Sequence, residues 1–122
     1  MGELFHLNGI KGKIINKGVY EREIKILSSP SSTIKRLDFT VGISIIGPGK
    51  MHEKHKHSKN EELIIVIKGK GLAKIANRQF EICTGSVIGL GKNEPHEFIN
   101  TGTIDLQLLW IYSPPGAEEK FL

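Results

Sequence analysis

The feature that most constrains the fold is a series of short β-rich runs separated by turn residues. Eight runs are predicted as strands: 21–27, 38–46, 63–67, 72–76, 79–82, 86–90, 96–100 and 105–113. The connections are rich in Gly, Pro and Asn and are too short for crossover helices, so neighbouring strands are expected to run antiparallel. Eight to ten strands in one domain favour a closed barrel or a jelly roll, because either architecture protects the sheet edges.

Length and composition predict one globular domain over residues 1–122. The chain has 122 residues, of which 39% are apolar and 25% charged, as in ordinary folded domains. Its net charge is +4, but the basic residues are scattered, so we expect no nucleic-acid partner. The sequence shows neither a signal peptide nor an apolar run of about 18 residues, which predicts no membrane association and a cytoplasmic location. Cys83 is the only cysteine, and we expect it to pack in the interior.

Histidines are concentrated at two places in the chain. His52, His55 and His57 precede one predicted strand, and His96 begins another. Side chains alternate along an extended strand, so His55 and His57 are expected to point to the same face. Adjacent strand residues face opposite ways, so at most one of the Glu61–Glu62 pair can join the histidines. Two imidazoles on one face can share a metal ion.

The spacing of these residues resembles the first motif of the cupin superfamily. That motif reads Gly, five residues, His-x-His, three or four residues, Glu, six residues, Gly. Every position of it is matched here, by Gly49, His55, His57, Glu62 and Gly69. The motif selects Glu62 over Glu61, and Glu61 is expected to face solvent.

A second stretch is similar to the second cupin motif, which contains a Pro-x-Gly turn followed by His and Asn. The matching positions are Gly85, Gly91, Asn93, His96 and Asn100. Gly91 stands where proline is usual, and Asn93 stands where glycine is usual. Asparagine is the residue that best replaces glycine at positive φ, so the turn is expected to be preserved. Asn100 is expected to fasten a turn.

The resemblance implies an all-β fold, a single cupin-type antiparallel β-barrel of the double-stranded β-helix or jelly-roll kind. Motif 1 spans 49–69 and motif 2 spans 85–100. The resemblance also implies a homodimer and one divalent transition metal ion (Mn, Fe, Ni, Co, Cu or Zn), held by His55, His57, Glu62 and His96. Three imidazoles and one carboxylate suit such a metal, and on an octahedral ion they leave two positions open.

His52, four aromatic residues and the C-terminal tail are each predicted to have mainly structural roles. His52 lies outside the ligand pattern and is predicted to be an exposed loop residue near the barrel mouth, with an acid–base role or a supporting role beside the metal as the alternative. Four aromatic residues are predicted to lie in the core: Phe39, Phe98, Trp110 and Tyr112. Phe98 shares the face of His96 by alternation, so it is the first candidate to line a pocket. The tail, residues 117–122, is predicted as a short helix or a dimer-swapping arm.

Fold and metal together leave the reaction open, because cupins host many activities. The leading hypothesis is a metal-dependent enzyme, first of all a dioxygenase, acting on a small organic substrate that chelates the ion. Glu62 would then be both a metal ligand and a catalytic base. One alternative is a binding or sensor domain that holds a small ligand without turnover. Another is a cupin-type sugar or sugar-phosphate isomerase or epimerase.

Overall fold

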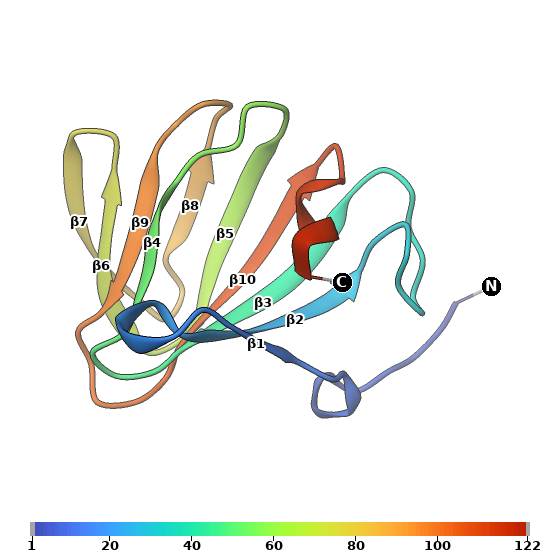
Figure 1. Ribbon diagram of the computed structural model, residues 1–122, viewed down its shortest axis with the longest axis horizontal. Helices are drawn as coiled ribbons and strands as arrows, with labels where there is room; N and C mark the ends of the chain where they lie inside the picture. The colour runs from blue at the N-terminus through green and yellow to red at the C-terminus, as the bar shows by residue number, and fades with distance from the viewer. Residues whose placement is uncertain (1, 122) are drawn as a thin grey trace.

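The computed structural model describes residues 2–121, with only the backbone at residues 119 and 120. Short 3-10 helices accompany an otherwise β-rich chain (Figure 1). The helices are η1 (Leu7–Gly9), η2 (Gly18–Tyr20) and η3 (Ala117–Phe121). The strands are β1 (Lys13–Ile15), β2 (Arg22–Ser28), β3 (Thr40–Ile46), β4 (Met51–His55), β5 (Glu61–Lys68), β6 (Lys70–Ile75), β7 (Arg78–Cys83), β8 (Val87–Leu90), β9 (His96–Asn100) and β10 (Leu106–Ser113). Among the described residues, no helix is long and apolar enough to cross a membrane.

The strands form two antiparallel sheets. A six-stranded sheet has the order β1-β2-β3-β10-β5-β8, and a four-stranded sheet has the order β4-β9-β6-β7. Strands far apart in sequence are neighbours, as where β10 lies between β3 and β5. The two sheets remain separate and do not close into one continuous hydrogen-bonded barrel. This arrangement confirms the predicted all-β, antiparallel jelly-roll class.

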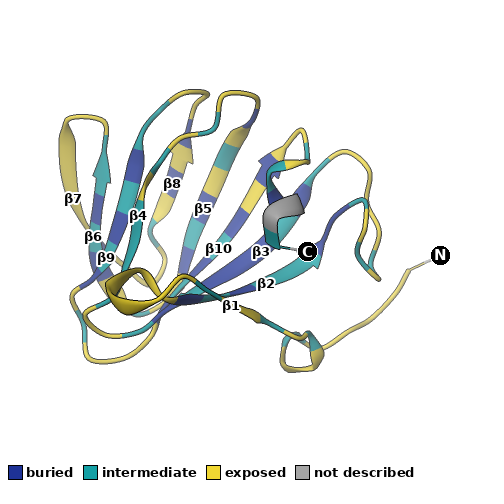
Figure 2. Ribbon diagram, viewed as in Figure 1, coloured by how far each residue is buried: buried dark blue, intermediate teal, exposed yellow. Residues whose placement is uncertain are grey.

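The hydrophobic core lies between the two sheets. Leu106, Leu108 and Val66 come from the six-stranded sheet, whereas Phe98 and Ala73 come from the four-stranded sheet, and each is at most 1% exposed. Alternation along β10 shows why: its even-numbered residues from 106 to 112 are buried, and the residues between them are more exposed (Figure 2). Burying one face of each sheet against the other is the main stabilising contribution.

All eight predicted strands are present, with ends within about two residues of the expectation, as is usual for such boundaries. Two strands were not predicted. The first, β1, has only three residues. The second, β4, has the polar sequence Met-His-Glu-Lys-His and therefore lacks an apolar alternation. It forms because its backbone pairs with β9, where His52 lies opposite Phe98 and His55 lies opposite His96.

Two turn predictions are confirmed. Asn93 has a φ of 62°, the left-handed conformation that was expected for an asparagine in the place of glycine. The Asn100 side chain donates hydrogen bonds to the carbonyls of Ile46 and Ile104, at 2.8 and 2.9 Å. Its Oδ1 accepts a hydrogen bond from the amide of Gly102 at 2.9 Å. Asn100 thus ties the end of β9 to the loop before β10 and to the end of β3.

Two core predictions are wrong. Cys83 is exposed, because it follows the inward-facing Ile82 and ends β7, an edge strand of its sheet. Phe39 is only half-buried, since it lies just before β3 and lines a surface groove away from the histidines. Phe98, Trp110 and Tyr112 are buried as predicted.

Candidate metal centre

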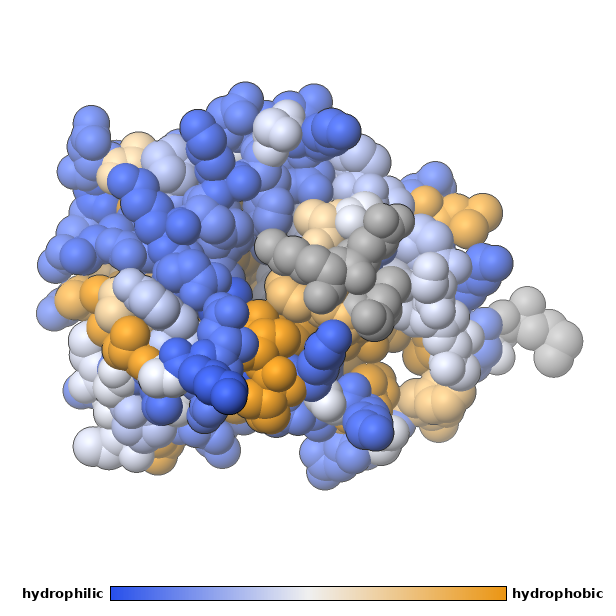
Figure 3. All heavy atoms as spheres, viewed as in Figure 1, coloured by the Kyte–Doolittle hydropathy of each residue, from blue (hydrophilic) through white to orange (hydrophobic). Residues whose placement is uncertain are grey.

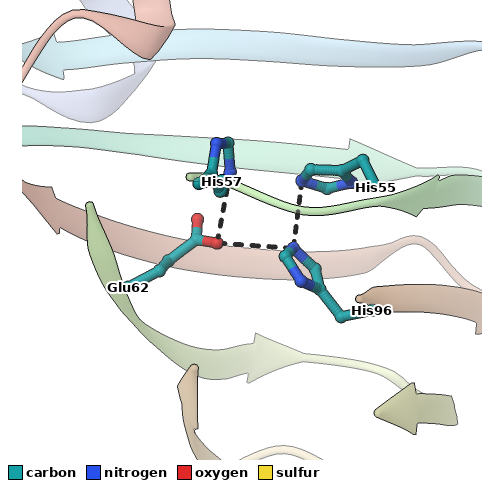
Figure 4. A group of neighbouring side chains, drawn as sticks. All are labelled: His55, His57, Glu62 and His96. Atoms are coloured by element: carbon teal, nitrogen blue, oxygen red, sulfur yellow. Dashed lines mark hydrogen bonds and ion pairs between the residues drawn. The ribbon is translucent and has the colours of Figure 1, made fainter. Parts of the chain in front are cut away.

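The four residues predicted as metal ligands lie together. One donor atom from each of His55, His57, Glu62 and His96 falls within 4.8 Å of all the others (Figure 4). His55 ends β4, His57 follows in the connecting loop, Glu62 begins β5 and His96 begins β9. Both sheets therefore contribute to the cluster, since β5 belongs to the six-stranded sheet and β4 and β9 to the other.

The distances within the cluster are short. The Nε2 atoms of His55 and His96 are 3.0 Å apart. The Oε1 atom of Glu62 lies 3.5 Å from Nε2 of His96 and 3.7 Å from Nε2 of His57. The side chains of Glu62 and His96 are only 8% and 2% exposed, so these charged or chargeable groups converge away from bulk water.

Backbone carbonyls fix the orientation of two of the rings. Nδ1 of His55 lies 3.2 Å from the carbonyl of Glu53, and Nδ1 of His96 lies 2.9 Å from that of Glu94. A carbonyl oxygen only accepts hydrogen bonds, so each Nδ1 carries the hydrogen and each neutral ring presents a lone pair on Nε2 to the cluster. Histidines that bind metals are commonly held by such carbonyl contacts. The residues therefore fit a divalent cation between them.

Burial favours the neutral forms of His52 and His96, because it lowers the pKa of each. It lowers the pKa of His96, and the hydrogen bond to Glu94 offsets only part of this effect. Burial also lowers the pKa of His52 well below its usual value, and the Arg22 guanidinium and the neighbouring imidazoles further disfavour a positive charge there. Neutral imidazole is the form that binds a metal ion, so the surroundings of these rings suit ligation.

The predicted exposed loop position of His52 is wrong. His52 lies in β4, is half-buried, and its ring centroid is 4.2 Å from that of His55. Three residue steps in β4, from His52 to His55, match only two steps in β9, so the ladder contains a bulge. The extra residue reverses the alternation, and both rings consequently reach the same cavity. His52 thus lies beside the four candidate ligands, and its acid–base or supporting role stays a prediction.

A cavity of about 70 Å³ adjoins the cluster. Its apolar wall comes from both sheets and includes Ile24, Ile64, Phe98, Leu108 and Trp110. Trp110 is fixed by a hydrogen bond from its indole nitrogen to Ser44, at 2.9 Å, and it stacks on Tyr112 at 5.4 Å between ring centroids. Phe98 lines the cavity, in agreement with the prediction that it shares the face of His96. This wall keeps the donor atoms in apolar surroundings.

Arg22 lines the same cavity and was missed by the sequence analysis. Its side chain is 3% exposed, and its terminal nitrogens donate hydrogen bonds to the Glu53 carboxylate at 3.0 and 3.2 Å. The guanidinium thus holds the residue whose carbonyl orients both His52 and His55. The alternation of side chains along β2 could have identified it. Arg22 lies two residues before Ile24 and shares its inward face, where a charged residue is unusual.

The C-terminal segment covers the cavity. Ala117 and Phe121 of η3 line it, and Glu118, 3% exposed, anchors the segment. One carboxylate oxygen of Glu118 accepts hydrogen bonds from Thr40, Tyr112 and the amide of Gly116, at 2.8 to 2.9 Å. Burial opposes ionisation of Glu118, but these hydrogen bonds outweigh it and lower its pKa. Residues 117–121 thus form a short 3-10 helix, as the first of the two predicted alternatives had it, and residue 122 lies outside the described residues.

Comparison with known proteins is consistent with this architecture. Over 76 residues the chain is 32% identical to an uncharacterized protein of Methanocaldococcus jannaschii. The aligned region covers 62% of this chain and 61% of that protein. It is 33% identical over 84 residues to auxin-binding protein 1 of Arabidopsis thaliana, covering 62% of this chain and 42% of that one. The chain thus matches about three fifths and two fifths of the lengths of these relatives.

A solved structure and a family model extend the comparison. The structure of a predicted oxalate decarboxylase from Thermotoga maritima superposes with a TM-score of 0.80 at 23% identity, over 91% of this chain and 98% of that one. At this identity the likeness concerns the fold alone. Residues 42–112, more than half of the chain, match the model of the cupin domain. The chain therefore belongs to the cupin family.

Proposed function

We propose that this cupin is a metal-dependent enzyme that acts on a small organic substrate able to chelate the metal. The observation that carries the proposal is the convergence of three imidazoles and one carboxylate within 4.8 Å, beside an apolar cavity. His55, His57, Glu62 and His96 would hold one divalent ion of the series Mn, Fe, Co, Ni, Cu or Zn, for which imidazole and carboxylate donors are suitable.

The roles of the protein residues follow from their positions. When bound, the ion would supply Lewis-acid polarisation of substrate oxygens. The carbonyls of Glu53 and Glu94 keep two imidazoles oriented, and the apolar wall around Phe98 and Trp110 excludes water. Glu62 is the proposed base, because its carboxylate lies inside the cluster and is only 8% exposed.

Dioxygenase activity is the reaction we propose first, and oxygen uptake tests it. Protein loaded with iron(II) or nickel(II) would be assayed against hydroxy acids, β-diketones and flavonols. We expect substrate-dependent oxygen consumption that falls by about 100-fold or more in Glu62→Gln, as for loss of a general base. Glu61→Gln is the matched control and should retain activity, because Glu61 is exposed. Loaded protein that consumes no oxygen with any of these compounds would rule out the dioxygenase reaction.

The second candidate is a domain that binds a small ligand without turnover. It is favoured by the sequence similarity to auxin-binding protein 1 and by the C-terminal segment that covers the cavity. Calorimetry would distinguish the two, because a binding domain should give saturable heat with no product. A sugar-phosphate isomerase has less support. A phosphate group would need a basic partner, and Arg22 is the arginine among the described residues that line the cavity. Both of its terminal nitrogens already donate hydrogen bonds to Glu53.

We also propose that the protein is a homodimer and that it is cytoplasmic. The location rests on the sequence alone. The outer face of the six-stranded sheet supports the dimer, because Leu63, Val87 and Ile111 there are 43%, 63% and 36% exposed and two of them are paired across β5 and β10. Light scattering is expected to give twice the 13.5 kDa chain mass. The double change of Leu63 and Val87 to lysine should yield a monomer, whereas Leu4→Lys should not. A monomeric wild-type protein would disprove the dimer.

A further inference from the structure

The cavity at the metal cluster is too small for most substrates on its own. Its volume is about 70 Å³, and one water needs roughly 10–15 Å³ by the same kind of measure. Pockets for small organic molecules typically measure about 300–1,000 Å³. The cavity therefore has room for a chelating head group of a few atoms and not for a larger molecule.

A larger groove of about 590 Å³ is lined in part by Ile24 and Ile26 of β2. It is lined by Phe5, residues 9–13, β2, residues 31–34 and Phe121 of η3. The apolar part of the lining includes Phe5, Ile10, Ile26, Leu27 and Ile34, and the polar part consists of Lys11, Lys13, Ser31, Ser32 and Thr33. Phe5 is 50% exposed, and none of these five apolar residues is fully buried. In the space-filling view, hydrophobic residues reach the surface beside the C-terminal segment (Figure 3). Concave apolar surface of this size marks a binding site more often than a solvated face.

Two residues line both spaces. Ile24 of β2 and Phe121 of η3 border the metal-side cavity and also the groove. Ile24 is 3% exposed and fixed in the core, whereas Phe121 packs against the core from the short C-terminal helix. The helix is held through the hydrogen bonds of Glu118, three residues before Phe121. Of the two residues that line both spaces, Phe121 is therefore the one that comes from the short C-terminal helix rather than from a core strand.

We propose that the groove is the second compartment of the substrate site and that the substrate tail passes from the first compartment into it beside Phe121, which lines both. The inference rests on the proposed function. The substrate class is then an amphipathic chelator: a compact oxygen-bearing head at the histidine cluster and an uncharged apolar tail along Ile26, Leu27 and Ile34. The groove lining carries no acidic residue among those described, and its two lysines, Lys11 and Lys13, belong to the N-terminal segment. An aliphatic or aromatic tail matches these surroundings, because its burial is favourable by the hydrophobic effect.

The test uses n-alkyl hydroxamates, from acetohydroxamate to octanohydroxamate, titrated by calorimetry into the full chain loaded with nickel(II). If the tail enters the groove, affinity should rise about fourfold per added methylene until the groove is filled, the factor that corresponds to about 0.8 kcal/mol per buried methylene. Ile34→Asp should flatten this dependence and leave acetohydroxamate binding unchanged. Phe5→Asp, at a position that is 50% exposed and lines the groove, should also weaken the dependence on chain length. Leu37→Asp, at a position that is 67% exposed and outside the lining, should not.

The outcomes separate the two proposals. Acetohydroxamate and octanohydroxamate binding with equal affinity would disprove the second compartment and leave the metal centre intact. Failure of every hydroxamate to bind would overturn both. If Ile34→Asp instead halves the mass in light scattering and leaves the chain-length dependence unaltered, the groove is a contact between copies of this chain and the compartment is disproved.

Discussion

Replacing His57 with alanine is expected to lower metal affinity by more than about 100-fold, so that the dialysed protein retains far less than one equivalent. The reason is that the change removes one of three imidazoles, a loss greater than the 10–100-fold typical for residues that only support metal ligands. His57 lies in the loop after β4 with its Nε2 3.7 Å from Glu62, so the backbone pairing of β4 and β9 does not depend on it. Elemental analysis after dialysis, combined with competition against a chelator, measures the effect.

The adjacent glutamates provide the matched control. Glu62→Gln should weaken metal binding, because it replaces the carboxylate of the cluster with a neutral amide. Glu61→Gln removes the same charge one residue away, on the exposed side of β5, and should keep a full equivalent of metal. A His57→Ala protein that binds one equivalent with wild-type affinity would contradict the assignment.

Replacing Phe98 with alanine is expected to lower the free energy of unfolding by about 3–5 kcal/mol, the usual cost of removing a buried phenylalanine ring. Phe98 is 1% exposed, and it packs between the sheets while also lining the cavity. Loss of the ring leaves a void that the strand ladders on both sides cannot close by a small shift. Urea unfolding followed by tryptophan fluorescence gives the change.

Phe80→Ala is the control for this measurement. Phe80 is 39% exposed on the edge strand β7, where the Arg78 guanidinium lies 5.1 Å above its ring. We expect a cost below about 1 kcal/mol, mostly from the lost cation–π contact. Equal costs for Phe80 and Phe98 would contradict the position of the core between the two sheets.

Much of the fold could be predicted because the strands carry their own signals. The predominantly apolar run 105–113 predicts the strand β10, and the turn residues 114–116 mark its end. The strand β4 could not be predicted this way. Its inward positions carry histidines instead of apolar residues, and its extended shape comes from pairing with β9, 41 residues away between His55 and His96.

The candidate site likewise contains residues that the sequence predicts and residues that it does not. The spacing of His55, His57 and Glu62, with His96 further on, could be read directly from the sequence. The position of His52 could not, because one bulge residue in β4 reverses the alternation on which the prediction depended. Arg22 and Glu118 were missed because their roles depend on partners distant in sequence, Glu53 and Thr40, which strand periodicity does not identify.

The most direct test of the proposed metal centre is anomalous diffraction from crystals grown with one equivalent of manganese(II), cobalt(II) or nickel(II). We expect a single strong anomalous peak between Nε2 of His55, His57 and His96 and a carboxylate oxygen of Glu62, about 2.0–2.3 Å from each. A fully loaded protein whose anomalous peak lies elsewhere, with these four side chains in the arrangement of Figure 4, would contradict the proposed metal centre.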